Sequence, residues 1–153
     1  DEKIKTKGFG SGHGSKHAFV LKTRDAAHPV MQGLPTEWLH ATDELYHRMR
    51  GSPDHMDALA SAFSSEKFGG TEMHEPMVWW AKFGEGRVVT TSMGHLWVGD
   101  KTFEALHCVG FQTILARSTE WAATGKVTIP VPAGFPTKDQ TSVIEPSKVV
   151  WKK

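Results

Sequence analysis

The segment that decides the fold is Gly86–Trp97, with the sequence GRVVTTSMGHLW. Its first half is rich in Val and Thr, which favour β-strands because branched side chains pack well on a pleated surface. Gly94 then follows, and glycine lets the backbone turn sharply or approach a ligand closely. His95 comes directly after this glycine. Ligands of open α/β sheets bind beyond the carboxyl ends of the strands, so His95 is the first candidate for a chemical role.

Three more strands are predicted around this segment. Met73–Phe83 precedes it across the turn Gly84–Gly86, so the two segments form a hairpin. His17–Thr23 and Met56–Phe63 show the alternation or β-rich composition of further strands. Apolar residues occur on both faces of these strands, which predicts helices packed against the sheet.

One helix is predicted, at 101–123, because apolar residues recur there at three- and four-residue steps. Asp100 is its expected N-cap and Gly125 its expected C-cap. Cys108 lies inside this helix and is interpreted as a small packing residue, since reactive cysteines favour helix N-termini or charged neighbours. Val127–Ile129 is expected to add an edge strand.

The composition excludes several classes of protein. A chain of 153 residues suits one domain with a real core. A formal net charge of +1 gives no reason to expect nucleic acid or acidic membranes as partners. No apolar run approaches the roughly 20 residues of a membrane span, and a single cysteine excludes an internal disulfide. Because the chain begins with Asp1, we expect a segment upstream, and a signal peptide there would make the protein periplasmic or secreted.

The chain divides into three parts. Residues 1–16 are charged and then glycine-rich, which is typical of a flexible segment, and residues 17–129 carry the predicted α/β domain. Residues 130–153 hold four prolines and are expected to form an extended tail or linker. His13 and His17 are interpreted as solvated loop residues.

The adjacent acids Asp43 and Glu44 are the strongest carboxylate candidates. They would point to opposite faces of a strand, or lie about 100° apart on a helix, so at most one should enter a given pocket. Which of the two does so stays open, as does the alternative of a solvated acidic turn before Tyr46. His40 and His47 are interpreted as surface residues.

Several short segments, in this order and spacing, resemble the ThuA-like (trehalose-utilisation) family over residues 8–137. They are His28-Pro29-Val30, Gly33-Leu34-Pro35, Trp38, Asp43-Glu44-Leu45-Tyr46, His74-Glu75-Pro76-Met77, Gly84-Glu85-Gly86-Arg87-Val88, Gly94-His95 and Thr119–Gly125. The resemblance implies a flavodoxin-like three-layer α/β sandwich, similar to class I glutamine amidotransferases. It also implies that the chain lacks the family's N-terminal portion, so a further domain or a second copy would cover the sheet.

The chain departs from the amidotransferases at two points. His95 occupies a place similar to that of their catalytic histidine, but Trp97 stands where they carry a glutamate. The elbow cysteine is also missing. Glutamine hydrolysis is therefore not expected.

The resemblance lines a crevice with catalytic and binding candidates. His95 is the expected acid, base or ligand, with Asp43 or Glu44 orienting it. The expected substrate-binding residues are His28, Tyr46, Glu75 and Trp97, and His95 with His74 would hold zinc or another divalent metal. Because the chain has no short His-x-x-His or Cys-x-x-Cys pattern, such a metal site would have to form from distant segments.

The predicted function is acid–base or metal-assisted chemistry on a carbohydrate or keto-sugar derivative in disaccharide utilisation. The alternative is a non-catalytic carbohydrate-binding or scaffolding module of a larger protein, which the Pro-rich tail favours. The sequence leaves open which of the two applies.

Overall fold

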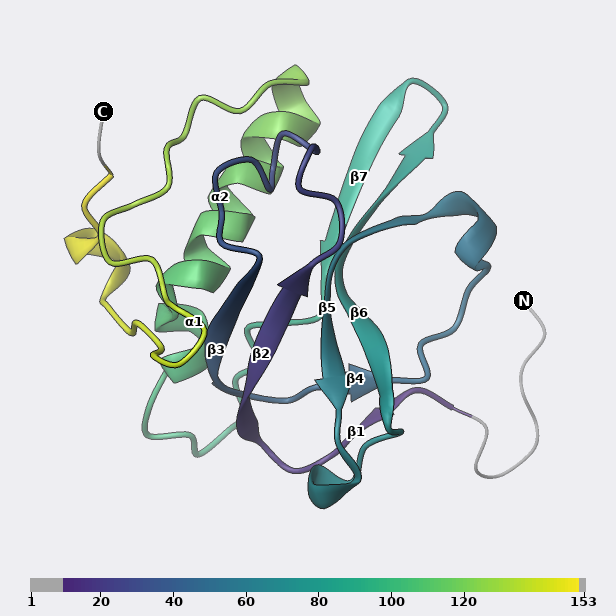
Figure 1. Ribbon diagram of the computed structural model, residues 1–153, viewed down its shortest axis with the longest axis vertical. Coiled ribbons are helices and arrows are strands. Elements are labelled where there is room, and N and C mark those ends of the chain that lie inside the picture. Colours follow the sequence, from purple (N-terminus) through teal and green to yellow (C-terminus); the bar gives the residue numbers. More distant parts are fainter. Residues whose placement is uncertain (1–9, 152–153) are drawn as a thin grey trace.

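The computed structural model describes residues 10–151 and has a five-stranded sheet at its centre (Figure 1). The strand order is β3-β2-β5-β6-β7, and each neighbouring pair is antiparallel. The strands are β2 (His17–Thr23), β3 (Glu37–Asp43), β5 (Asp57–Ser64), β6 (Met73–Phe83) and β7 (Gly86–Thr91). The predicted α/β class is confirmed. Parallel pairs, which define a flavodoxin-like sheet, do not occur among the strand pairs of residues 10–151.

The predicted hairpin and two of the other predicted strands are present. The strand bounds for His17–Thr23 and Met73–Phe83 match the prediction, and β7 starts at Gly86 as expected but ends at Thr91. His95 therefore lies in a loop four residues beyond β7, rather than at the strand end. The strand β3 was not predicted.

The helical part differs from the single predicted helix. Two helices form, α1 (Glu104–His107) and α2 (Val109–Thr124), and Cys108 between them has extended backbone. Gly125 caps α2 as predicted, with a left-handed φ of 75° and its N–H donating to Trp121 O. Asp100 is not an N-cap, because α1 begins after Phe103. None of the described helices has the length and apolarity of a membrane span.

The break at Cys108 has a tertiary cause. Cys108 forms a β-bridge with Val143, so its backbone is extended where the local pattern favours a helix. Val109 N donates to Ser142 O on one side, and Ile144 N donates to His107 O on the other. The C-terminal segment packs against α1 and α2, as Figure 1 shows.

Helix α2 crosses one face of the sheet. Near its start, Gly110 faces the fully buried Trp38 of β3, and a Cβ at Gly110 would lie 2.2 Å from the Trp38 ring. Near its end, Trp121 packs edge-on against Trp80 of β6, with ring centroids 5.2 Å apart. The predicted edge strand at Val127–Ile129 does not form, and the backbone there donates to the carboxylate of Glu120.

Two short strands lie outside the main sheet and position residues of the candidate site. They are β1 (Gly12–His13) and β4 (Tyr46–His47), and His13 pairs with Tyr46. The part of the predicted flexible segment before Gly10 lies outside the described residues.

The surface interpretation of His40 and His47 is wrong, since their exposed fractions are 0% and 8%. His40 is on the buried face of β3, a strand that was not predicted. The remaining short elements are 3-10 helices at Pro53–His55, Glu66–Phe68 and Pro146–Lys148.

Candidate functional site

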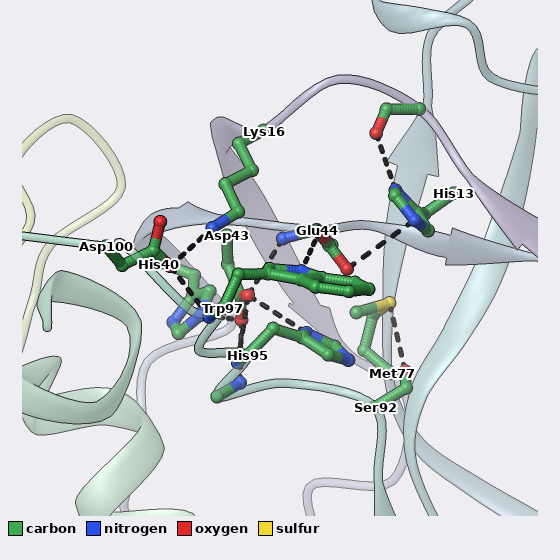
Figure 2. A network of polar contacts seen from close by, with 12 residues as sticks. His13, Lys16, His40, Asp43, Glu44, Met77, Ser92, His95, Trp97 and Asp100 are labelled. Atoms are coloured by element: carbon green, nitrogen blue, oxygen red, sulfur yellow. Dashed lines mark hydrogen bonds and ion pairs between the residues drawn. The ribbon is translucent and has the colours of Figure 1, made fainter.

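The loop after β7 is held by the carboxylate of Asp43, which stands at the end of β3 (Figure 2). Asp43 Oδ2 accepts the N–H of Gly94 at 2.7 Å, and Oδ1 accepts the N–H of His95 at 3.1 Å. Oδ1 also accepts from the ring of His95, with Nδ1 at 3.0 Å. One side chain thus fixes both the backbone of this loop and the orientation of the imidazole.

Asp43 is buried and has two further donors. His40 Nε2 lies 2.9 Å from Oδ2, and Glu44 N lies 2.8 Å from Oδ1. Burial alone would raise the pKa of Asp43, but the hydrogen bonds from His40 and His95 hold it well below its usual range. Asp43 is therefore ionised near neutral pH and can only accept hydrogen bonds.

The ionised carboxylate sets the tautomer of His95. Its Nδ1 must carry the proton that Asp43 accepts, which leaves Nε2 as the atom that can take up or release a proton. The side chain of His95 is 25% exposed, and its ring stacks on Tyr46 at 4.7 Å. This is the arrangement of a general base oriented by a carboxylate.

Glu44 forms a second histidine–carboxylate pair with His13 of β1. Glu44 is buried, its Oε1 accepts from Trp97 Nε1, and its Oε2 has no hydrogen-bond partner within the described residues. His13 Nε2 lies 3.7 Å from this oxygen. The other ring nitrogen, Nδ1, lies 2.9 Å from Gly14 O and must donate there. A proton on His13 Nε2, or a donor group of a ligand, would satisfy the carboxylate.

A polar hollow of about 190 Å³ lies beside His95. It is lined by Lys16, Thr42, His95, Asp100, Thr102, Glu104 and Ala105. Lys16 Nζ pairs with Asp100 at 2.7 Å, and Asp100 also accepts the N–H of Trp97 at 2.9 Å. This use of Asp100 to close the loop explains why it does not cap the helix. The Trp97 side chain is exposed in the same loop.

The structure brings some of the predicted site residues together and separates others. His95, Asp43, Glu44, Tyr46 and Trp97 lie in the network described above. Both adjacent acids are buried in this network, but they face different histidines, Asp43 binding His95 and Glu44 lying beside His13.

His28 does not join this site. It packs edge-on against Trp121, 4.4 Å between ring centroids, near the C-terminal end of α2. Burial lowers the pKa of His28, so the ring is neutral and acts as part of the core.

Glu75 and His74 also lie elsewhere. Glu75 accepts from Thr71 Oγ1 at 2.8 Å and lines a separate groove with Trp79. His74 lies 3.3 Å from Ser61 Oγ and lines a different hollow from His95, the other histidine predicted as a metal ligand. Residues 10–151 contain no group of three or more His, Cys, Asp or Glu placed to hold a metal ion.

Two histidines of this network were missed by the sequence reasoning. His13 was placed in a flexible segment, and only the β1–β4 pairing brings it to Glu44. His40 was placed on the surface, because β3 was not predicted. The one usable signal was the alternation of Trp38 and His40, which puts the histidine on the same face as a large apolar residue.

The fold and the site define an α/β domain with two histidine–carboxylate pairs at one end of an antiparallel sheet. The family model for ThuA, trehalose utilisation, matches residues 6–122. The chain therefore belongs to the ThuA family.

A solved structure of a ThuA-like protein from Parabacteroides merdae ATCC 43184 is similar, with a TM-score of 0.83 and 45% sequence identity. The match covers 88% of this chain and 48% of the other, so the chain spans about half the length of that protein. No curated protein matches the chain.

Proposed function

We propose that this domain acts on a carbohydrate, or on a keto derivative of one, by acid–base chemistry at His95. The observation that carries the proposal is the Asp43–His95 hydrogen bond of 3.0 Å beside a solvent-reachable hollow. The class of substrate rests on the family's description, trehalose utilisation.

The two histidine–carboxylate pairs suggest complementary roles. His95 Nε2 takes the proton from a carbon next to the ketone, and that electron pair forms a carbon–carbon double bond. The ketone oxygen receives a proton from His13 Nε2, and the product is an enediol. Asp43 accepts a hydrogen bond from His95, and Glu44 lies 3.7 Å from His13, so each carboxylate orients its own histidine. General acid–base catalysis of this kind contributes roughly 10²–10⁴-fold to a rate.

The size and lining of the hollow support a small polar substrate. At about 190 Å³ it is smaller than the roughly 300–1,000 Å³ of pockets for drug-sized ligands. One sugar ring is therefore the expected occupant, with hydroxyl groups meeting Lys16, Asp100 and Glu104. Trp97 offers an exposed apolar ring surface in the same loop, on which a second sugar ring would stack.

Deuterium exchange tests the proposal without requiring that the final product be known. The purified protein is incubated in D₂O with a disaccharide carrying one ring ketone, and exchange at the neighbouring carbons is followed by NMR. We expect catalysed exchange that His95→Ala abolishes and that His13→Gln reduces at least tenfold. His55→Gln, at an exposed histidine outside the site, is the matched control and should leave the rate unchanged.

The same experiment separates an enzyme from a binding module. Saturable binding of the sugar with no exchange above background, in a protein of unchanged melting temperature, would favour the non-catalytic module and overturn the proposal. The exposed Trp97 is the feature that would serve such a module.

A further inference from the structure

The network of Figure 2 contains one buried titratable residue that neither pair uses, His40 of β3. Its ring is fully buried, yet it faces an ionised carboxylate, with Nε2 at 2.9 Å from Asp43 Oδ2. Its other nitrogen, Nδ1, has no hydrogen-bond partner within the described residues. Such a group is expensive to bury unless its charge is matched by a neighbour.

We propose that His40 is a positioning residue that carries a buried positive charge behind Asp43, and that this charge limits how strongly Asp43 attracts a proton to His95. The two histidines approach opposite oxygens of one carboxylate. The negative charge of Asp43 is therefore shared between two rings. A positive charge on His40 therefore weakens the attraction of Asp43 for a proton on His95.

The groups that face His40 support a charged ring. From its own strand it faces Asp43, and from the junction of α1 and α2 it faces the thiol of Cys108. The neighbouring rings of Phe19 and Trp38 are apolar and exclude water. Burial would lower the pKa of His40, but Asp43 and Cys108 together raise it to about 9.

The pKa of Cys108 is lowered, as expected for a thiol beside a positive charge. Burial alone would raise the pKa of this thiol, whereas His40 and the backbone N–H groups of Phe111 and Ala41 lower it. The sulfur is thus a polarisable neighbour of the charged His40 ring, rather than a nucleophile, because no part of Cys108 is exposed.

The surroundings of His95 show why the charge of His40 matters for its role as a base. Besides Asp43 and the stacked Tyr46, the groups that face it across the hollow are Lys16, Asp100 and Glu104, and Lys16 is already paired with Asp100. A general base works best when its affinity for protons suits the working pH. Without a second positive charge, the full charge of the buried Asp43 would act on His95 alone. The functional consequence rests on the proposed role of His95, but the charge state of His40 does not.

Nitrogen-15 NMR of the histidine rings tests the charge directly in the unmodified protein. We expect both ring nitrogens of His40 to carry protons at pH 7.5, with the ring losing one only near pH 9. A neutral His40 at pH 7.5 would overturn the proposal. This measurement needs no substrate and no variant, so it holds whatever the activity is.

His40→Gln tests the influence on His95, because glutamine keeps an N–H donor for Asp43 but carries no charge. The His40 and His95 charges are separated by roughly 8 Å or less through the carboxylate. At that separation, removing one charge should move the midpoint of the His95 ring signals upward by about 1–1.5 pH units. The pH profile of proton exchange should move by the same amount, while the maximal rate changes little.

Cys108→Ala is the matched control for packing next to His40. Because the thiol is one of the two groups that raise the pKa of His40, this change should lower the His40 midpoint, while the carboxylate of Asp43 keeps the ring charged at pH 6. An unchanged His95 midpoint in His40→Gln would contradict the proposal, and so would a His40 ring that is neutral at pH 6 in Cys108→Ala. If exchange is absent in every variant but the His95 midpoint still moves, the proposed function fails and this inference stands.

Discussion

Asp43→Asn is the perturbation that tests the network most directly. The two side chains have nearly the same shape, so the change removes charge and acceptor capacity without opening a cavity. Asparagine offers one acceptor oxygen, and its NH₂ group only donates. Asp43 now accepts from His40, Gly94, His95 and Glu44. In either orientation of the amide, at least two of these donors face an NH₂ group.

The expected cost follows from those donors. Leaving a buried donor unsatisfied costs about 1–3 kcal/mol, and removing one partner of a buried ion pair costs about 3–5 kcal/mol. Because both figures describe partly the same contacts of Asp43, they overlap, and we expect a loss of about 3–5 kcal/mol in the free energy of unfolding. For a domain of this size, 1 kcal/mol corresponds to about 2–4 °C, so the melting temperature should fall by roughly 6–20 °C.

Thermal and denaturant unfolding followed by circular dichroism would measure this loss. Asp100→Asn makes the same chemical change at a partly exposed carboxylate that pairs with Lys16, and it should have a much smaller effect. If Asp43→Asn melts within about 2 °C of the unmodified protein, then Asp43 does not organise the loop and the reasoning is refuted.

Three further outcomes are expected from the same structure. The pKa of His40 is raised from 6.5 to about 9, so this ring should add about 3 kcal/mol to the free energy of unfolding below pH 6.5. That stabilisation should be lost as the pH rises through 9. Denaturant unfolding across this pH range measures it, and His40→Gln should make the stability much less dependent on pH. Gly110→Ala should destabilise the protein by about 1–3 kcal/mol through overpacking, because the new Cβ would lie 2.2 Å from the Trp38 ring, and unfolding within error of the unmodified protein would contradict this contact. Trp97→Phe removes the N–H whose hydrogen bond Glu44 accepts, so amide hydrogen exchange in the loop around residue 97 should become faster. The free energy of unfolding should change by about 1 kcal/mol or less. Unchanged exchange would show that this contact does not order the loop.

The elements predicted well are those whose cause is local. The hairpin of β6 and β7 follows from two strand-forming segments on either side of Gly84–Gly86, and the cap of α2 follows from a single glycine with a left-handed φ. In both cases the residues that specify the structure lie within a few positions of it. Sequence patterns of this kind therefore sufficed for them.

The elements missed have causes far away in the sequence. The strand β3 has the sequence EWLHATD, whose polar residues suggest a solvated turn. His40 and Asp43 are nevertheless buried, because each satisfies the other and the loop at Gly94 supplies further donors. The break at Cys108 likewise depends on Val143, which is 35 positions further along the chain.

The candidate site shows the same division between local and distant causes. His95 could be predicted because a glycine and a histidine follow a strand, and the acids could be predicted as a pair. Their assignment to different histidines could not, because it depends on β3 ending at Asp43. Beyond that point strict strand alternation no longer applies, so Glu44 turns toward His13 of β1 while Asp43 holds His95. The strand pairing of β1 with β4 is what delivers His13, so a change that breaks this pairing should disable the second pair and leave the first intact.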